Sequence, residues 1–348
     1  MPIITSHASR RSAEMPQNKA WTLASFPSGT LREDNFKLVE APAPAPKDGE
    51  VLVKNLWLSL DPYMRGRLTQ QKSYVKGVEI GEVMTGETAG EVVESRHPKF
   101  KPGDTVTAPS GWQLYCSVNG ELLTKVDASR APLSNYLGCL GMPGRTAYFG
   151  MKDIGAPKPG ETVVVSAASG AVGMVVGQIA KIKGCRAVGI AGGREKCEYL
   201  VRELGFDAAI DYKSDDVKRT LRQHCPQGVD VYFDNVGGEI LDTVLTQLAR
   251  NARIVICGAI SQYNSTTGVR GPANYMSLLV NRASMTGMLV FDYASRYPEA
   301  MREMAGWLAA GKLKTREDIV AGLETFPETL LKLFKGENFG KLVLKVSG

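Results

Sequence analysis

The 348-residue sequence lacks the features that mark membrane and secreted proteins. Its longest apolar runs, such as residues 187–191 and 254–260, are far shorter than the roughly 20 residues that span a bilayer. The six cysteines stand singly, without a Cys-x-x-Cys pair. We therefore expect a soluble, cytoplasmic protein with reduced thiols and no membrane partner.

Blocks of charge of one sign are also missing. The net charge of +6 comes from 42 basic and 36 acidic residues, and no run of Lys or Arg exceeds two. Such mixing is typical of a solvated surface, so we expect no nucleic-acid partner. Residues 1–19 contain two arginines but no apolar core of signal-peptide length, and we interpret them as a flexible tail.

Metal ligands and the common nucleophile motifs are scarce. The only histidines are His7, His97 and His224, and none has a second ligand at motif spacing. The cysteines do not cluster as a structural zinc site requires, and the sequence has neither a G-x-S-x-G elbow nor a P-loop. We expect no metal site and neither acyl nor phosphoryl transfer, which leaves hydride transfer.

What the sequence does contain is a change of pattern near residue 140. Before it, β-rich runs broken by Pro and Gly occupy residues 21–26, 36–42, 50–60, 88–95 and 104–118. After it, helices alternate with predicted strands at 161–168, 185–192, 206–212, 228–236, 252–260 and 284–290. A helix near 298–310 follows, and the β-run 341–348 is predicted to return to the first domain. This pattern predicts a two-domain α/β protein with a doubly wound parallel sheet.

A glycine turn follows the first strand of the alternating region. Ala168, Gly170 and Gly173 have the spacing of the G-x-G-x-x-G fingerprint, with alanine in place of the first glycine, and a helix begins at Met174. Glycines there let a pyrophosphate approach the backbone N–H groups at the helix start. The turn therefore predicts a dinucleotide site; the alternative is a tight strand-to-helix turn without a ligand.

The end of the second strand distinguishes the two nicotinamide dinucleotides. An NAD site places a carboxylate there to hold the ribose hydroxyls. This sequence reads Ala191-Gly192-Gly193-Arg194, with Lys196 two residues later. The positive charge favours a ribose 2′-phosphate and therefore NADP(H). The alternative is that Arg194 and Lys196 are ordinary residues of an exposed first helical turn.

Six ordered motifs resemble one family across nearly the whole chain from Trp21 onward. They are SLDPYMRGR (59–67), GMPGRTAY (141–148), AASGAVGMVVGQIAKIKGC (167–185), YFDNVGG (232–238), ICGAISQYN (256–264) and KGENFGKLVLKV (335–346). The sequence resembles the zinc-independent medium-chain dehydrogenase/reductases, in the group of prostaglandin and curcumin reductases. The resemblance implies a GroES-like β domain (20–140 and 312–348) and a Rossmann NADP-binding domain (141–311), with a tail at 1–19. It also implies a homodimer.

The resemblance further implies a set of NADP(H)-binding residues. They are Met142, Thr146, Gly170, Ala171, Val172, Gly173, Gly193, Lys196, Tyr212, Asn235, Cys257, Gly258, Ala259, Ile260, Tyr263, Met288, Leu289, Val290 and Asn338. Each has a simpler interpretation: Asn235 could end a strand, Cys257 could fill a core, and Asn338 could cap a turn. Family members often have an aromatic residue where this chain has Met288-Leu289-Val290.

The chemistry that the resemblance implies is reduction of the carbon–carbon double bond of an α,β-unsaturated ketone or aldehyde. Hydride addition to the β-carbon places negative charge on the carbonyl oxygen, which needs a hydrogen-bond donor. Our first candidate is the phenol of Tyr263 and the second is that of Tyr63; solvent is the alternative proton source. Tyr63 could instead be a packing residue. A quinone reductase and a non-catalytic NADPH-binding protein are the competing hypotheses.

Overall fold

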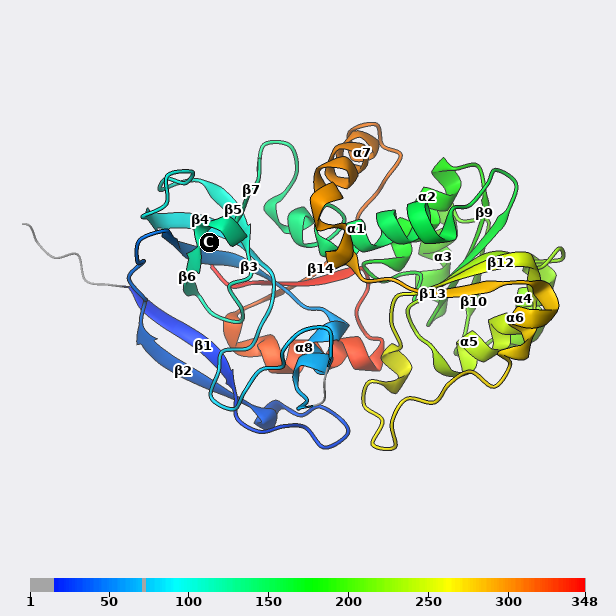
Figure 1. Cartoon of the computed structure of the whole chain (residues 1–348), viewed down its shortest axis with the longest axis horizontal. Coiled ribbons are helices and arrows are strands. Elements are labelled where there is room, and N and C mark those ends of the chain that lie inside the picture. The colour runs from blue at the N-terminus through cyan, green and yellow to red at the C-terminus, as the bar shows by residue number, and fades with distance from the viewer. Residues whose placement is uncertain (1–15, 71–72, 348) are drawn as a thin grey trace, which may run out of the picture.

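Two sheets of different kinds organise the chain in the computed structural model, which describes residues 16–70 and 73–347. Figure 1 shows an antiparallel region and a parallel region side by side, with α7 and α1 between them. Both regions are built from the β-rich and alternating halves that the sequence predicted. The α/β fold class is therefore confirmed.

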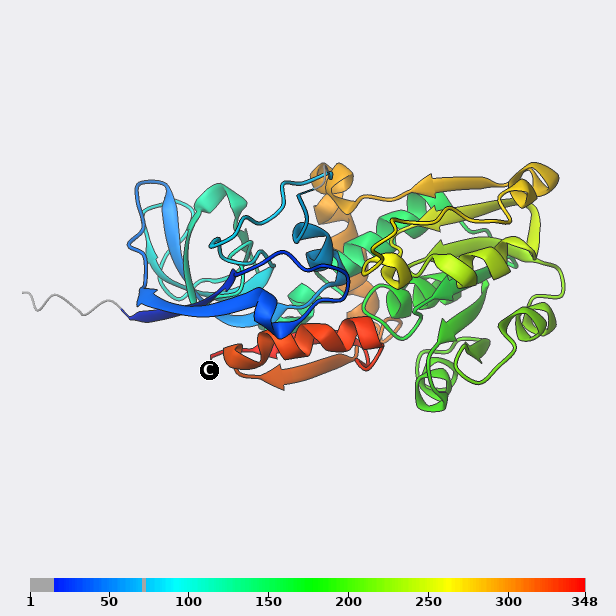
Figure 2. The same cartoon turned by 90° about the horizontal axis from the view of Figure 1, so that it is seen from below.

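The antiparallel region contains a seven-stranded sheet in the order β14-β15-β3-β4-β5-β7, with β6 also paired to β3. Its strands are β3 (Glu50–Ser59), β4 (Thr88–Ser95), β5 (Thr105–Ala108), β6 (Tyr115–Asn119), β7 (Thr124–Lys125), β14 (Glu317–Ala321) and β15 (Lys341–Lys345). A separate hairpin joins β1 (Gln17–Leu23) to β2 (Phe36–Pro42). Figure 2 shows β14 and α8 lying along the same region as the N-terminal strands.

The parallel region is a six-stranded sheet in the order β10-β9-β8-β11-β12-β13. Its strands are β8 (Thr162–Ser166), β9 (Arg186–Ala191), β10 (Ala208–Asp211), β11 (Val229–Asp234), β12 (Leu248–Ile256) and β13 (Ser284–Gly287). Every residue of β8 is buried, as expected for a strand covered on both faces. The order reverses between β8 and β11, which is where a doubly wound sheet binds its ligand.

Helices cover both faces of the parallel sheet. The α-helices of the described residues are α1 (Met142–Phe149), α2 (Gly173–Ile182), α3 (Arg194–Arg202), α4 (Val217–His224), α5 (Gly238–Leu245), α6 (Met276–Asn281), α7 (Tyr297–Ala309) and α8 (Phe326–Lys335). One apolar core joins α1, α2, α3 and α7 to the sheet, and another joins α4 and α5 to the opposite face. Helix α8 belongs to the antiparallel region, where Phe326 and Leu330 are fully buried.

Short helical segments complete the chain. They are η1 (Glu33–Asn35), η2 (Pro62–Arg67), η3 (Gly120–Leu122), η4 (Leu133–Leu137), η5 (Gly150–Gly155), η6 (Ile260–Gln262), η7 (Val290–Arg296) and η8 (Leu323–Thr325). Segment η5 extends α1 as a π-helix. Among the residues of 16–70 and 73–347, no helix has the length and apolarity needed to span a membrane.

Several predicted boundaries differ from the structure. Strand β1 begins at Gln17, which pairs with Pro42, so the described part of the predicted tail is already structured at residues 17–19. The run 104–118 divides into β5 and β6 because Pro109 lacks the N–H that a ladder needs. Strand β13 ends at Gly287, which leaves residues 288–290 outside it. The predicted return of the C-terminal β-run is confirmed, because β15 pairs with β3.

Candidate active site

A cavity of about 1010 Å³ lies where the carboxyl ends of the parallel strands face the antiparallel region. Most of the predicted site residues line it, from segments that are far apart in the sequence. They are Tyr63, Met142, Thr146, Gly170, Ala171, Val172, Gly173, Lys196, Tyr212, Asn235, Cys257, Gly258, Ile260, Tyr263, Met288, Leu289, Val290 and Asn338. The structure therefore brings these residues together around one space.

Two predicted residues do not line the cavity. The Gly193 N–H donates to Asp211 Oδ1 at 2.7 Å, where it starts α3 with a φ of 104°. The Ala259 N–H donates to the Tyr263 hydroxyl at 3.3 Å. Gly193 and Ala259 therefore hydrogen-bond to other residues near the cavity, namely Asp211 and Tyr263.

The glycine turn between β8 and α2 forms one end of the cavity. A Cβ at Gly173 would lie 2.3 Å from the Ala167 carbonyl oxygen, so this close approach requires glycine. Ala167 itself has a φ of 48°. The N–H groups of Met174, Val175 and Val176 bond to carbonyls of the turn itself. Residues 170–173 line the cavity in front of this helix start, and the positive end of a helix dipole suits an anion. The Gly340 N–H donates to the Ser169 carbonyl at 3.0 Å and joins this turn to β15.

Lys196 and Tyr212 line the cavity beside the turn that follows β9, and both lie next to Gly336. The Lys196 ammonium donates to the Gly336 carbonyl at 2.7 Å, which leaves two further N–H donors. Burial, aided by the nearby charge of Lys213, lowers the pKa of Lys196. Gly192 is tightly packed there, because a Cβ would come within 2.8 Å of the Tyr212 ring.

Arg194 points elsewhere, in contrast to the interpretation of the sequence. Its guanidinium pairs with Glu198 at 2.7 Å and its side chain is 90% exposed. It does not line the cavity. Of the two positive charges predicted at the end of the second strand, only that of Lys196 therefore faces the candidate site.

A buried carboxylate shapes the turn after β11. Asp234 Oδ1 accepts hydrogen bonds from the Tyr232 hydroxyl at 2.8 Å and from the backbone N–H groups of Val236 and Gly237 at 3.0 and 2.9 Å. The Asn235 side-chain amide donates to the Ser166 carbonyl at 2.8 Å. These bonds fix the NVGG turn against the end of β8, so Asn235 has a defined place on the cavity wall.

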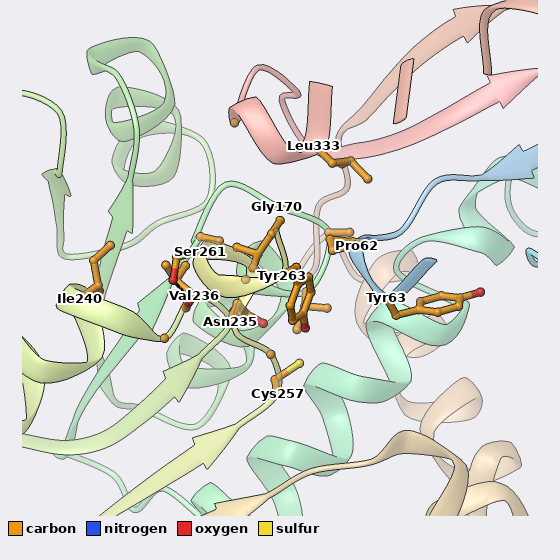
Figure 3. Close-up of a pocket in the computed structure, with 18 of the residues that line it drawn as sticks. Pro62, Tyr63, Gly170, Asn235, Val236, Ile240, Cys257, Ser261, Tyr263 and Leu333 are labelled. Carbon is orange, nitrogen blue, oxygen red and sulfur yellow. Dashed lines mark hydrogen bonds between the residues drawn. The ribbon is translucent and has the colours of Figure 1, made fainter. Parts of the chain in front are cut away.

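Tyr263 and Cys257 both line the cavity, and Figure 3 shows their side chains near each other. Burial is the main cause that raises the pKa of Tyr263, against the opposing effect of the Ala259 N–H. The phenol therefore stays protonated near neutral pH and remains a hydrogen-bond donor. Burial, with a further contribution from Asp234, raises the pKa of Cys257 to about 12, so the thiol is also protonated.

Tyr63 occupies the opposite wall, and in Figure 3 its ring extends away from Tyr263. The Arg67 guanidinium lies over the Tyr63 ring at 5.3 Å, and burial raises the pKa of this phenol strongly. Both tyrosines line the cavity, but only the Tyr263 side chain lies beside Asn235 and Cys257 in this view.

A fully buried ion pair holds the segment that precedes Tyr63. Lys341 Nζ contacts Asp61 Oδ1 at 2.6 Å, and the two side chains are 2% and 6% exposed. The same ammonium donates to Ser59 Oγ at 2.6 Å and to the Leu60 carbonyl at 2.9 Å. Both charged residues line the cavity, and the sequence analysis identified neither, because no local pattern connects residues 280 positions apart.

Two further aromatic residues of the cavity mouth were missed. Tyr74 and Phe291 are 57% and 47% exposed, and their ring centroids lie 6.4 Å apart. Phe291 directly follows the predicted segment 288–290, in which the absence of an aromatic residue had been noted. The sequence could have identified Phe291 if the predicted segment 288–290 had been extended by one residue.

The histidines lie apart from the cavity within the described residues. His97 Nε2 contacts Glu121 Oε1 at 3.0 Å on the surface, and the His224 carbonyl accepts a bond from Arg186. His7 lies outside the described residues. Within residues 16–70 and 73–347, no group of three or more His, Cys, Asp or Glu side chains is arranged to hold a metal ion.

Family models match both regions of the chain. Residues 19–126 match the N-terminal domain of oxidoreductases, and residues 171–306 match a model described as zinc-binding dehydrogenase. These matches correspond to the antiparallel and the parallel regions, respectively.

Individual relatives match over nearly the full length. The NADPH-dependent curcumin reductase of Escherichia coli is 47% identical, over 95% of this chain and 98% of that protein. The NADP(+)-dependent 2-alkenal reductase of Nicotiana tabacum is 43% identical, over 96% and 99%. The crystal structure of CurA from Vibrio vulnificus in complex with NADPH superposes with a TM-score of 0.90 at 46% identity, over 95% and 99%. The chain therefore belongs to the medium-chain dehydrogenase/reductase superfamily, in the family of the curcumin, 2-alkenal and prostaglandin reductases.

Proposed function

We propose that the protein uses NADPH to reduce the carbon–carbon double bond of α,β-unsaturated ketones and aldehydes. The observation that carries the proposal is one cavity lined both by the glycine turn at the start of α2 and by a buried phenol, Tyr263, whose raised pKa keeps it protonated. The activities printed for the curcumin and 2-alkenal reductases support the same reaction class.

The residues present fit NADPH. Gly170 and Gly173 leave the start of α2 open to a pyrophosphate, and Lys196 with Tyr212 offers a cation and a ring for the ribose 2′-phosphate and adenine side. Asn235, the segment 257–263, Met288–Val290 and Asn338 are proposed to hold the ribose and nicotinamide, with Met142 and Thr146 at the border. A carboxylate that would repel the 2′-phosphate is not among the residues lining the described cavity near Lys196.

Bound NADPH supplies the hydride. The Tyr263 hydroxyl donates a hydrogen bond to the carbonyl oxygen of the substrate, where charge accumulates as the enolate forms. A raised phenol pKa keeps that proton available near neutral pH. The proton for the α-carbon comes from Tyr263, Tyr63 or solvent. The apolar rings of Tyr74 and Phe291 at the mouth suit the carbon skeleton of the substrate.

The substitution Tyr263→Phe tests this role. We expect kcat for an enone to fall by about 10²-fold, the scale of general acid catalysis, because the ring remains and only the donor is lost. Tyr275→Phe is the control, since Tyr275 is 59% exposed and does not line the cavity. Turnover of Tyr263→Phe within about twofold of wild type would show that this phenol is not the donor.

The substitution Lys196→Ala tests the cofactor. We expect the KM for NADPH to rise by roughly tenfold or more, the scale of one lost charge-assisted hydrogen bond, while NADH use stays nearly constant. Steady-state kinetics with both cofactors measures the ratio. Equal losses for NADPH and NADH would contradict a contact with the 2′-phosphate.

A substrate panel separates the competing functions. NADPH consumption with 2-alkenals, phenylbutenones, curcumin and quinones is followed together with product analysis. Saturation of the enone double bond supports the proposal, whereas turnover of quinones alone identifies a quinone reductase. Tight NADPH binding without turnover of any compound identifies a non-catalytic binding protein.

We also propose a homodimer. Strand β13 is the last strand of the parallel sheet, and the neighbouring α6 exposes Leu279 and Val280 at 70% and 65%. A second copy paired along β13 would cover this unpaired edge and the apolar side chains beside it. Light scattering tests the mass, and charge substitution of Leu279 is expected to give monomers.

We keep the domain division 20–140 with 312–348 against 141–311 as a proposal. Every strand of the parallel sheet falls within 141–311, and every other described strand falls within 20–140 or 312–348 except for the first residues of β1. A cytoplasmic location is likewise proposed, supported by six free cysteines. Limited proteolysis and cell fractionation test the two statements.

A further inference from the structure

Arg145 lies on the same helix as Met142 and Thr146, yet it does not line the cavity. Its side chain is only 14% exposed, and one of its terminal nitrogens contacts Glu87 Oε1 at 3.2 Å. Glu87 immediately precedes β4 and therefore belongs to the antiparallel region. The pair thus joins the two regions directly behind the cavity wall.

The other side of the Arg145 guanidinium faces an aromatic ring. The guanidinium carbon lies 4.3 Å from the centroid of the Tyr297 ring, at the first residue of α7. The Tyr297 hydroxyl donates to the Val290 carbonyl at 3.1 Å. Val290 is 5% exposed and lines the cavity. A continuous chain of contacts therefore runs from Glu87 through Arg145 and Tyr297 to the segment Met288–Val290.

Stability alone does not explain this arrangement. Arg145 Nε and Glu87 Oε2 are both buried and have no hydrogen-bond partner among the described residues, which costs free energy. A buried ion pair is weak evidence for stability, because apolar side chains of similar volume often serve as well. The planar guanidinium can, however, fix the positions of two groups at once, because its edge bonds to a carboxylate while its face stacks on an aromatic ring.

We propose that Arg145 is a positioning residue for hydride transfer. Held between Glu87 and Tyr297, it fixes the Met288–Val290 segment relative to Met142 and Thr146, and so sets the width of the space for the nicotinamide ring. This inference rests on the proposed function. It assigns to Arg145, Glu87 and Tyr297 an effect on the placement of the ring, without contact to substrate or cofactor.

A matched pair of substitutions tests the last link. Tyr297→Phe removes the hydroxyl that bonds to Val290, whereas Tyr293→Phe removes a hydroxyl from the same stretch of chain that makes no hydrogen bond to the described residues. We expect Tyr297→Phe to lower kcat roughly 5- to 10-fold, the scale of one lost hydrogen bond, with the KM for NADPH within about twofold. Tyr293→Phe should match wild type in both.

Arg145→Lys tests the guanidinium itself. Lysine retains the charge but cannot bond and stack as a plane, so we expect kcat to fall at least as far as in Tyr297→Phe. Glu87→Gln keeps an acceptor for Arg145 and should retain most of the turnover. If Arg145→Lys fails to fold, the tyrosine pair still decides the proposal.

A second readout does not depend on turnover. The fluorescence of bound NADPH reports the surroundings of the nicotinamide ring, so Tyr297→Phe should move it toward that of free NADPH without weakening binding. Lys196→Ala should do the reverse, with weaker binding and unchanged fluorescence at saturation. If wild type reduces no enone, the proposed function fails while this measurement still tests the position of the ring. Equal behaviour of Tyr297→Phe and Tyr293→Phe, or an effect of Tyr297→Phe on melting temperature alone, would overturn the inference.

Discussion

The two walls of the cavity are built in opposite ways. The parallel-sheet wall consists of strand ends and turns that follow one another along the chain, such as the glycine turn after β8 and the NVGG turn after β11. The opposite wall brings Asp61 and Lys341 together across 280 positions and fixes them by a buried ion pair. The parallel-sheet wall therefore depends on backbone geometry, whereas the opposite wall depends on an ion pair that is buried away from solvent.

The largest effect is expected from breaking the buried pair. Lys341→Met leaves the Asp61 carboxylate buried without its partner, and such losses cost about 3–5 kcal/mol. Urea unfolding measures the change in the free energy of unfolding. The double variant Asp61→Leu/Lys341→Met is the control and should recover most of the loss, because neither charge remains. A single variant within about 1 kcal/mol of wild type would show that this wall does not depend on the pair.

An intermediate effect is expected in the parallel-sheet wall. Gly173→Ala forces a Cβ to within 2.3 Å of the Ala167 carbonyl oxygen, and overpacking of this kind costs about 1–3 kcal/mol. NADPH binding should weaken as well, because the turn must shift. Gly306→Ala is the matched control in α7, where a Cβ has open space; it should stabilise the helix by about 0.5–1 kcal/mol. Equal shifts in the two variants would contradict a backbone-defined turn.

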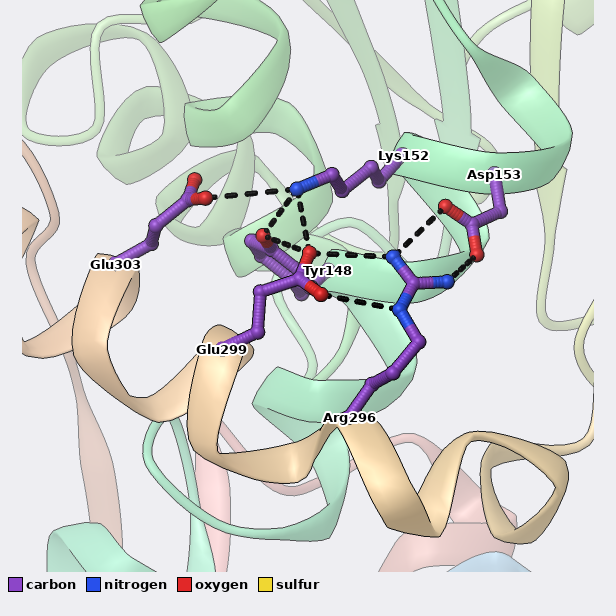
Figure 4. A network of polar contacts seen from close by, with 6 residues as sticks. All are labelled: Tyr148, Lys152, Asp153, Arg296, Glu299 and Glu303. Carbon is purple, nitrogen blue, oxygen red and sulfur yellow. Dashed lines mark hydrogen bonds and ion pairs between the residues drawn. The ribbon is translucent and has the colours of Figure 1, made fainter.

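The smallest effect on stability is expected from the half-exposed polar network that connects α7 to η5 (Figure 4). Its residues are Tyr148, Lys152, Asp153, Arg296, Glu299 and Glu303. Glu299 bonds to Arg296 and Lys152, and these hydrogen bonds lower its pKa to about 2. A carboxyl with a depressed pKa stabilises the fold fully above its ordinary pKa of 4.5, and this contribution is lost as the pH falls toward 2.

Unfolding curves between pH 5 and pH 2 measure that loss. Glu299→Gln should flatten the pH dependence in this window, while Glu303→Gln should leave it nearly intact, because Glu299 then keeps its partners. If the free energy of unfolding of Glu299→Gln falls with pH as steeply as that of wild type, other carboxylates cause the acid sensitivity. The small expected size follows from solvent screening of exposed pairs.

Local sequence patterns predicted the parallel-sheet wall well. Apolar runs located all six strands, and the glycine spacing located the turn before α2, because period and turn chemistry depend on neighbours in the chain. The antiparallel region was predicted less completely. Strand β14 was missed, since its residues Glu317–Ala321 are only partly buried and show little alternation.

The polar supports of the site were outside the reach of local patterns. Asp61 and Lys341 look like ordinary charged residues, as do Glu87 and Arg145, and only the tertiary fold buries them in pairs. The same limit explains Arg194, whose charge suggested a phosphate contact but whose side chain turns to Glu198. Charge in a sequence indicates a possible partner, whereas burial decides which partner it has.

The position of β15 has a consequence for the order in which the protein is made. It pairs with β3, yet it follows every other strand in the chain. A ribosome therefore releases the complete parallel sheet before the antiparallel sheet receives β15, the strand that links β14 to β3. Until then residues 57–59 of β3 lack the partner strand on one side, and Asp61 has no ammonium beside it. The growing chain therefore passes through a stage in which the parallel-sheet wall of the cavity can form, whereas the opposite wall forms only after β15 and Lys341 have been synthesised.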